Sequence, residues 1–203
     1  MIKMKLKTKR LILREWSKKD TDDLVEGLDN LKISRWLAPV PYPYTKKDAI
    51  EWINNCINES KKRKDRNYHF AIELKNEKKV IGGIGAYEIN KFNGLAHIGF
   101  WINEKYHKEG YGTEALDAEL KFIFNRLKLR RIETGFLRGN IRSLNLQKKF
   151  GFKIEGVRRK RFKCMADGKL KDEFISGLLR EDWKIYDNDF HRSRNRRRPY
   201  LGS

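Results

Sequence analysis

Apolar positions along the chain alternate between two periods, and the changes of period mark the expected elements. Period-two or continuous apolar runs predict seven strands, at residues 10–16, 68–74, 79–89, 95–102, 131–137, 152–163 and 171–179. Apolar stripes at helical spacing predict four helices, at residues 20–28, 45–62, 112–127 and 141–150. The order β-α-α-β-β-β-α-β-α-β-β predicts a mixed α/β fold with a largely antiparallel central sheet flanked by helices.

Local signals support several of these boundaries. Ser17–Asp20 and Thr45–Asp48 have the spacing of capping boxes, which begin helices. Asn93-Gly94 predicts a tight hairpin between two strands, and Asp167-Gly168 predicts another. Gly151 follows the last predicted helix in the position of a C-terminal cap.

Composition adds a strong basic character. The chain has 203 residues, a formal net charge of +20 and 39% apolar residues, which is enough for one domain with a core. We expect a single domain over residues 1–183 and a basic, flexible tail over residues 184–203, where arginines cluster with few apolar residues. A field of this sign attracts phosphates, from nucleic acid or from a polyanionic cofactor.

Few other classes of protein are compatible with the composition. Cys56 and Cys164 are far apart in sequence, and together with four scattered histidines they form no metal-ligand spacing, so we expect reduced thiols and no metal. No apolar run is long enough to cross a bilayer, and the first residues do not resemble a secretory leader. We therefore expect a cytoplasmic protein, monomeric or homodimeric, that does not contact membranes.

The most informative segment connects the predicted strand 95–102 to the helix 112–127 through a turn with Gly110 and Gly112. Glycines allow backbone N–H groups to approach an anion there, and the following helix N-terminus adds partial positive charge. His107 and Lys108 offer further donors. The segment lacks the Gly-Lys-Ser/Thr ending of a Walker A loop and the third glycine of a dinucleotide fingerprint.

These residues resemble the GNAT superfamily, in particular its ribosomal-protein N-acetyltransferases of the RimJ/RimL type. The pyrophosphate loop of that family, Gln/Arg-x-x-Gly-x-Gly/Ala, is similar to the sequence from His107 to Gly112, with His at its first position. The similarity extends in matching order from Thr8 to Trp183 and includes the block from Asn140 to Ser143. It implies splayed fourth and fifth strands, 95–102 and 131–137, with acetyl-CoA held between them.

The resemblance implies direct transfer of acetyl from acetyl-CoA to an amine, with both substrates bound together. A backbone N–H near residues 100–102 would meet the developing oxyanion. The expected acetyl-CoA contacts come from the end of the strand, the turn and the next helix start: Phe100, Trp101, Ile102, His107, Lys108, Glu109, Gly110, Tyr111, Gly112, Thr113, Asn140 and Ser143. Asn140 also suits a helix N-cap.

Catalytic residues are implied by the same comparison. His97 is the first candidate for the base, since a histidine titrates near neutrality, and Glu88 is the second. Many members of the superfamily place a tyrosine acid where this chain has Gln147, so Ser143 or a water would protonate the leaving thiolate. In this fold Trp36 and Tyr42 would lie in the region that shapes the acceptor site, although plain packing also explains them.

Three functions remain open from the sequence. The first is a protein or peptide N-terminal acetyltransferase of the ribosomal-protein type, for which the basic surface and arginine tail would suit contact with RNA or the ribosome. The second is a small-molecule acetyltransferase for an aminoglycoside or polyamine, although the +20 charge disfavours a polycationic acceptor. The third is a catalytically weak RNA- or ribosome-binding module on the same fold.

Overall fold

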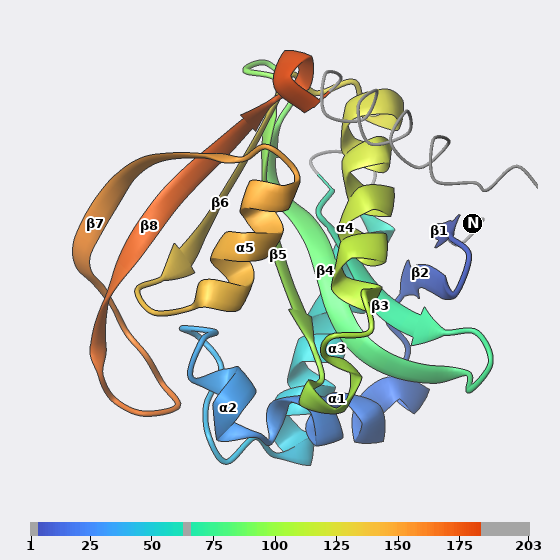
Figure 1. The fold of residues 1–203 in the computed structure, drawn as a ribbon. Coiled ribbons are helices and arrows are strands. Elements are labelled where there is room, and N and C mark those ends of the chain that lie inside the picture. Colours follow the sequence, from blue (N-terminus) through green and yellow to red (C-terminus); the bar gives the residue numbers. More distant parts are fainter. Residues whose placement is uncertain (1–3, 63–65, 184–203) are drawn as a thin grey trace, which may run out of the picture.

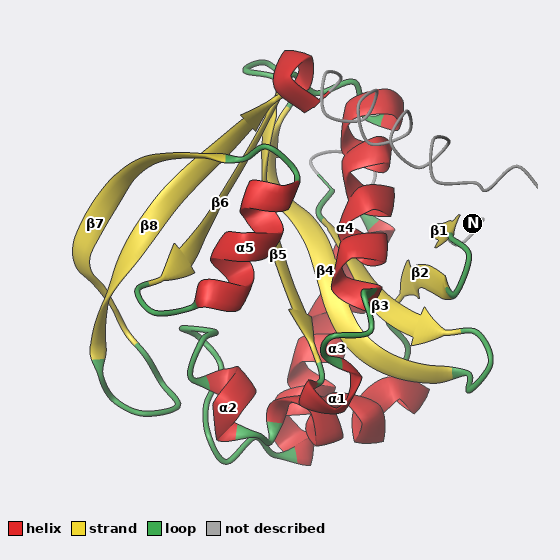
Figure 2. Cartoon of the chain, in the orientation of Figure 1, coloured by secondary structure: helices red, strands yellow, loops and turns green. Residues whose placement is uncertain are grey.

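The computed structural model describes residues 4–62 and 66–183, which form an open sheet with helices on both faces (Figure 1, Figure 2). The strand order is β1-β2-β3-β4-β5-β6-β8-β7, and every neighbouring pair is antiparallel except β5 and β6. The strands are β1 (Lys5–Lys7), β2 (Leu11–Glu15), β3 (Tyr68–Leu74), β4 (Lys79–Asn90), β5 (Leu95–Ile102), β6 (Arg131–Leu137), β7 (Lys153–Lys163) and β8 (Leu170–Leu179). The predicted mixed α/β fold with a largely antiparallel sheet is therefore confirmed.

Helical segments connect these strands. The α-helices are α1 (Thr21–Leu28), α2 (Leu31–Ser34), α3 (Lys46–Lys61), α4 (Tyr111–Lys121) and α5 (Ile141–Lys149). Two short 3₁₀ segments are η1 (Lys18–Asp20) and η2 (Glu104–Tyr106). Both predicted capping boxes form, at Ser17 and at Thr45. No helix within the described residues is long and apolar enough to span a membrane.

Sequence patterns missed three features. The edge strand β1 and the single turn α2 were not expected, because neither is long enough to show a period. The helix predicted over residues 112–127 is α4 followed by a π-helical segment, η3 (Phe122–Arg126). The basic tail expected over residues 184–203 lies outside the described residues.

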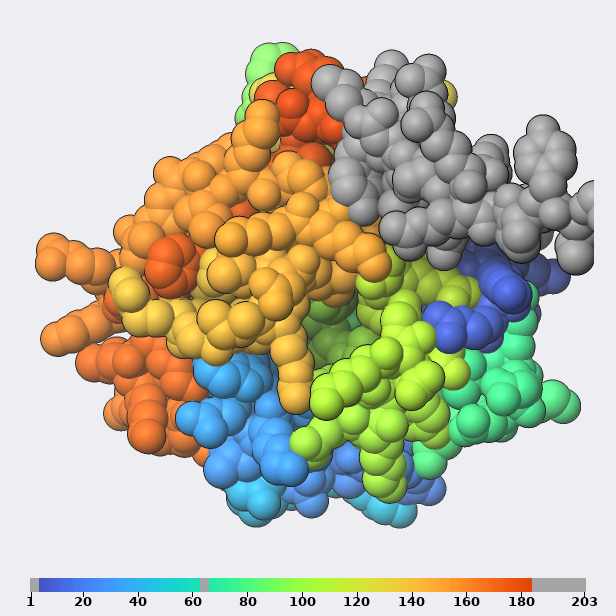
Figure 3. Space-filling model, in the orientation of Figure 1, coloured from blue at the N-terminus to red at the C-terminus, as the bar shows by residue number. Residues whose placement is uncertain are grey.

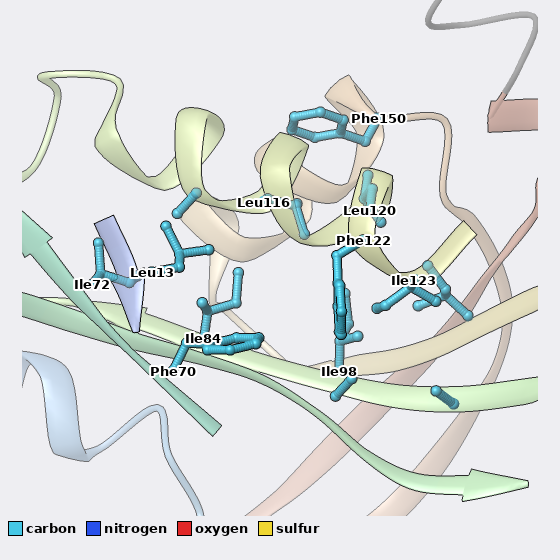
Figure 4. Close-up of a cluster of buried hydrophobic side chains, with 14 of the residues drawn as sticks. Leu13, Phe70, Ile72, Ile84, Ile98, Leu116, Leu120, Phe122, Ile123 and Phe150 are labelled. Carbon is cyan, nitrogen blue, oxygen red and sulfur yellow. The ribbon is translucent and has the colours of Figure 1, made fainter. Parts of the chain in front are cut away.

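The main hydrophobic core lies between the sheet and α4. Figure 4 shows Leu116 and Leu120 of α4 above sheet residues that include Leu13, Ile84 and Ile98. All five side chains are at most 4% exposed. Fully burying one such side chain stabilises the fold by about 1.5–3 kcal/mol, so this contact fixes where α4 begins relative to the end of β5.

A second core joins α1 and α3 to the other face of the sheet, around Leu24 and Ile53. Next to it, Arg14 donates to both carboxylate oxygens of Asp20 at 2.8 Å and to Glu73 at 2.5 Å. Asp20 is 2% exposed, so the guanidinium provides the charge that allows its carboxylate to be buried. Cys56 and Cys164 are buried free thiols, as expected.

Candidate functional site

Strands β5 and β6 separate after three residue pairs. They are paired in parallel from Leu95 opposite Arg131 to His97 opposite Glu133, and no pair follows. The Thr134 hydroxyl donates to the Ile98 carbonyl at 3.0 Å, which shows that the backbone of Ile98 faces β6. Because strand residues alternate in direction, the backbone of Phe100 faces the same gap without a strand to pair with.

The turn after β5 has the geometry of an anion site. Gly110 is the N-cap of α4 with φ +79°, in the left-handed region that glycine adopts without strain. Tyr111, Gly112 and Thr113 form the first turn of α4, whose backbone N–H groups have no partner within the helix. Lys108 also has a positive φ, +69°, so the chain curls tightly before the helix.

His107 contributes to the shape of this turn. Its Nε2 lies 2.8 Å from the carbonyl oxygen of Ile102, so Nε2–H donates to β5. The other ring nitrogen, Nδ1, is buried and has no partner in the described part of the chain. A role for His107 as a phosphate donor stays a prediction, and it would require a second ring proton, on Nδ1.

Arg10 supports the turn from the start of β2, and sequence reasoning did not single it out. Its guanidinium donates to the Glu109 carbonyl at 2.9 Å, pairs with Glu114 at 2.7 Å and lies 4.3 Å above the Tyr111 ring. A side chain that fixes the loop from another strand leaves no local sequence signal. Arg10 therefore adds a positive charge beside the anion turn.

The start of α5 forms the opposite wall. The Asn140 side chain accepts from the Ser143 amide at 3.2 Å, so the N-cap interpretation is confirmed. The Ser143 hydroxyl accepts from the Gln147 side chain at 3.1 Å and keeps its own proton. Gln147 is 2% exposed and also accepts from Ser176 at 2.5 Å. Gln147 is thus a buried bridge between α5 and β8.

A cavity of about 350 Å³ lies between the α2 region, η2 and the segment that connects β6 to α5. Figure 3 shows a hollow bounded by α5, the start of α4 and α2. The lining residues come from α2, η2 and the start of α5: Lys32, Arg35, Trp36, Glu104, Gly139, Asn140, Ile141 and Arg142. The structure thus brings the predicted Trp36 to the same cavity as Asn140, whereas Tyr42 is 44% exposed outside this lining.

The gap between β5 and β6 is called the split here, and its closed end is the last pair of the two strands, His97 opposite Glu133. His97 lies there between two carboxylates. Its Nε2 is 3.2 Å from Glu133 Oε2 and 3.7 Å from Glu88 Oε2. The Glu88 side chain is 72% exposed, and the residue has a φ of +50° where the pairing of β4 becomes irregular. The Glu88 backbone amide donates to the Asn67 side chain. The structure therefore brings both candidate bases together and adds Glu133 to them.

Phe100, Trp101 and Ile102 are placed by strand alternation on different faces. Phe100 and Ile102 pack with the α4 core, whereas Trp101 packs against the α1 core on the other face. A Cβ on Gly83 would lie 2.7 Å from the Trp101 ring, so glycine makes room for the indole. Side chains of these three residues are structural, and only their backbone can face an occupant of the gap.

The site combines a divergent pair of parallel strands with an anion-binding turn at the open end and His97 at the closed end. Together these features define an acyl-CoA-dependent transferase. The acetyltransferase (GNAT) domain family matches residues 10–153. The chain belongs to this family, and it is an acetyl-CoA-dependent acetyltransferase.

Three relatives illustrate the similarity. An uncharacterized N-acetyltransferase of Bacillus subtilis is 30% identical over 89% of this chain and 99% of its own length. The ribosomal protein uS5-alanine N-acetyltransferase of Escherichia coli is 28% identical over 57% of this chain and 59% of its own. The structure of the microcin C7 self-immunity acetyltransferase in complex with acetyl-CoA and AMP superposes with a TM-score of 0.72 and 19% identity, over 85% and 93% of the two chains.

The residues of this chain fit acetyl-CoA. Gly110 leaves the approach to the first amides of α4 open, since a Cβ there would meet only the Arg10 guanidinium, at 3.5 Å. Lys149 lies 3.4 Å from the Thr113 hydroxyl and adds a second cation near the start of α4. An anion at the turn would thus meet backbone donors and two positive side chains.

Proposed function

We propose that the protein transfers acetyl from acetyl-CoA to the amino terminus of a protein or peptide, in the cytoplasm. The observation that carries a primary-amine acceptor is the cluster of His97, Glu88 and Glu133 at the closed end of the split. The ribosomal-protein type of acceptor is supported by the E. coli relative and by the net charge of +20, which suits work near RNA. Contact with RNA is part of this proposal.

Acetyl-CoA supplies an activated acetyl group as its thioester. The first turn of α4 holds the diphosphate, and Asn140 directs its free amide N–H groups toward the pantetheine arm. The backbone N–H of Phe100 donates to the carbonyl oxygen as negative charge develops there. The split would thus hold the acetyl donor, with His97 available at its closed end.

His97 takes the proton of the attacking amine. A new C–N bond forms, the C–S bond breaks, and the electron pair of that bond goes to sulfur. The proton of the nitrogen passes to the free ring nitrogen of the imidazole, and Glu133 and Glu88, which lie beside Nε2, stabilise the resulting positive charge. Ser143 donates its free proton toward the thiolate, because Gln147 occupies only the acceptor side of its hydroxyl.

The test is thiol release from acetyl-CoA by the purified protein with two sets of acceptors. One set contains peptides with free α-amino groups, and the other contains spermidine and an aminoglycoside. Turnover with peptides alone supports the proposal, and turnover with the polyamine or aminoglycoside alone moves the function to small molecules. Absence of turnover with both, together with tight and salt-sensitive RNA binding, would support a binding module instead.

A further inference from the structure

Two glycines lie where the strands begin to separate. Gly99 of β5 and Gly135 of β6 each come two residues after the last pair, His97 and Glu133. Strand alternation places all four on one face, opposite α4 and α5. Because both residues are glycines, β5 and β6 contribute no side chains to the face of the split at this point.

Side chains from the two neighbouring strands cover these glycines from opposite sides. A Cβ on Gly135 would lie 2.6 Å from Glu173 Oε1 of β8, and a Cβ on Gly99 would lie 3.5 Å from the ring and 3.7 Å from the hydroxyl of Tyr87 of β4. Glu173 is held by Arg158, which donates to the other oxygen, Oε2, at 3.2 Å. Arg158 does not bind Oε1, which lies above the split and can therefore accept another hydrogen bond. The Glu173 side chain is 15% exposed.

Tyr87 and Glu173 cover neighbouring points of the two strands, since Gly99 and Gly135 each follow the last β5–β6 pair by two residues. Burial raises the pKa of Tyr87, and the charges of Glu88, Glu173 and Glu119 raise it further. Tyr87 is thus a neutral phenol at neutral pH. Its hydroxyl has no hydrogen-bond partner among residues 4–62 and 66–183, and its ring stacks on His97 at 6.0 Å between centroids.

The charged groups on this face give it an acidic character. Within the described residues, the Arg131 guanidinium binds both Glu133 and Glu155, Arg158 binds Glu173, and Glu88 contacts His97. Glu88, Glu133 and Glu173 lie near the split, whereas Glu155 lies over Gly177, and on a protein with a net charge of +20 these three carboxylates favour a cation.

We propose that Glu173 and Tyr87 form the site that binds the ammonium group of the acceptor before His97 removes its proton. Glu173 Oε1 accepts one ammonium N–H and the Tyr87 oxygen accepts another, which places the nitrogen over the gap between Gly99 and Gly135. His97 is the next side chain toward the closed end of the split on β5. This inference rests on the proposed function, because it needs a primary amine as the acceptor.

Glu173→Gln tests the site, and Glu155→Gln is its matched control. Glu155 is also paired with an arginine on this face, and its Oε1 lies over Gly177 in the same way, but away from the split. Because hydrogen bonds to charged groups are strong, Glu173→Gln should raise the KM for the amine about tenfold or more. The KM for acetyl-CoA should not change, and Tyr87→Phe should raise the amine KM by about threefold.

The assay measures thiol release against the concentration of an alanine-initiated hexapeptide and of n-butylamine. An amine KM that changes equally in Glu173→Gln and Glu155→Gln overturns the inference while leaving the proposed function intact. If the wild type turns over neither amine, the proposed function fails separately. Calorimetric titration of n-butylamine into the protein loaded with CoA then decides: binding lost only in Glu173→Gln supports the site, and no binding to the wild type overturns it.

Discussion

Glu119 of α4 breaks the usual pattern of a helix–sheet interface. Its side chain is 0% exposed, and neither carboxylate oxygen has a partner in the described part of the chain. Burial raises the pKa of this carboxyl well above its ordinary value of 4.5 and so favours its neutral form.

This burial makes stability depend on pH with a definite sign. Because the folded pKa is above the unfolded value of 4.5, the unfolded chain releases the proton first as pH rises. The free energy of unfolding falls by about 1.4 kcal/mol per pH unit above 4.5, as long as the buried carboxyl stays protonated. A further cost of about 1–3 kcal/mol, independent of pH, comes from leaving a buried polar group without a hydrogen bond.

Glu119→Leu should therefore stabilise the protein, by about 1–3 kcal/mol at pH 4.5 and by about 2 kcal/mol more near pH 6. Glu119→Gln should remove only the pH-dependent part, because it keeps a polar group of the same shape. Urea unfolding followed by tryptophan fluorescence at several pH values measures both, with unchanged m-values as the check. Parallel stability–pH curves for Glu119→Leu and wild type would show that folding does not raise the pKa of the carboxyl and would refute the reasoning.

Three further changes test other parts of the structure. Gly110→Glu should abolish acetyl-CoA binding in calorimetry, whereas Gly168→Glu, at another left-handed glycine with nothing within 4 Å, should leave the affinity unchanged. His97→Ala should lower turnover about 10²-fold or more near neutral pH with little change in acetyl-CoA affinity, and an unaltered pH–rate profile would remove His97 from the mechanism. Asp20→Asn should lower the free energy of unfolding by about 3 kcal/mol in denaturant titrations, since it leaves the Arg14 charge buried without a full partner; a loss below 1 kcal/mol would contradict this.

The Asp20 contribution also has a pH window. Burial by itself would raise the pKa of Asp20, but the hydrogen bonds and charge of Arg14, together with Ser17, outweigh it and lower the pKa below 3.8. A depressed pKa adds stability above the unfolded value, and this part is lost as pH falls through the folded value. The two residues therefore change the free energy of unfolding in different pH ranges: Asp20 does so below about pH 4, and Glu119 does so above pH 4.5.

Local patterns predicted most of the fold because its long elements have clear periods. The strands β3, β5 and β6 begin and end at the predicted residues, since apolar runs bounded by polar turns define them. The three-residue β1 has the burial pattern of an edge and no period to detect. The change to η3 after Lys121 depends on contacts distant in the chain: Phe122 packs on Tyr68 and Phe124 on Trp183.

The candidate site was only partly predictable. The glycine turn and Asn140 act within a few residues of the sequence, so their spacing carries the signal. Arg10, Tyr87 and Glu173 reach the site through contacts with residues distant in the chain, and pairing of β8 with β6 is what brings Glu173 over Gly135. The available signal was indirect: glycine at both positions after the last β5–β6 pair indicates that other side chains occupy that space.

Charges of opposite sign would act on the two substrates over different distances: the net positive charge on acetyl-CoA and local carboxylates on the amine. The net charge of +20 acts over the Debye length of about 8–10 Å and attracts the phosphates of acetyl-CoA to the protein. An ammonium approaching the same protein is repelled at that distance, so its binding must come from groups in direct contact. Glu173 and Glu133, each held by one arginine, provide negative charge at the split, on the face opposite α4 and α5. Under the proposed function, this placement would let one basic protein bind a polyanion and a cation from different faces of the sheet.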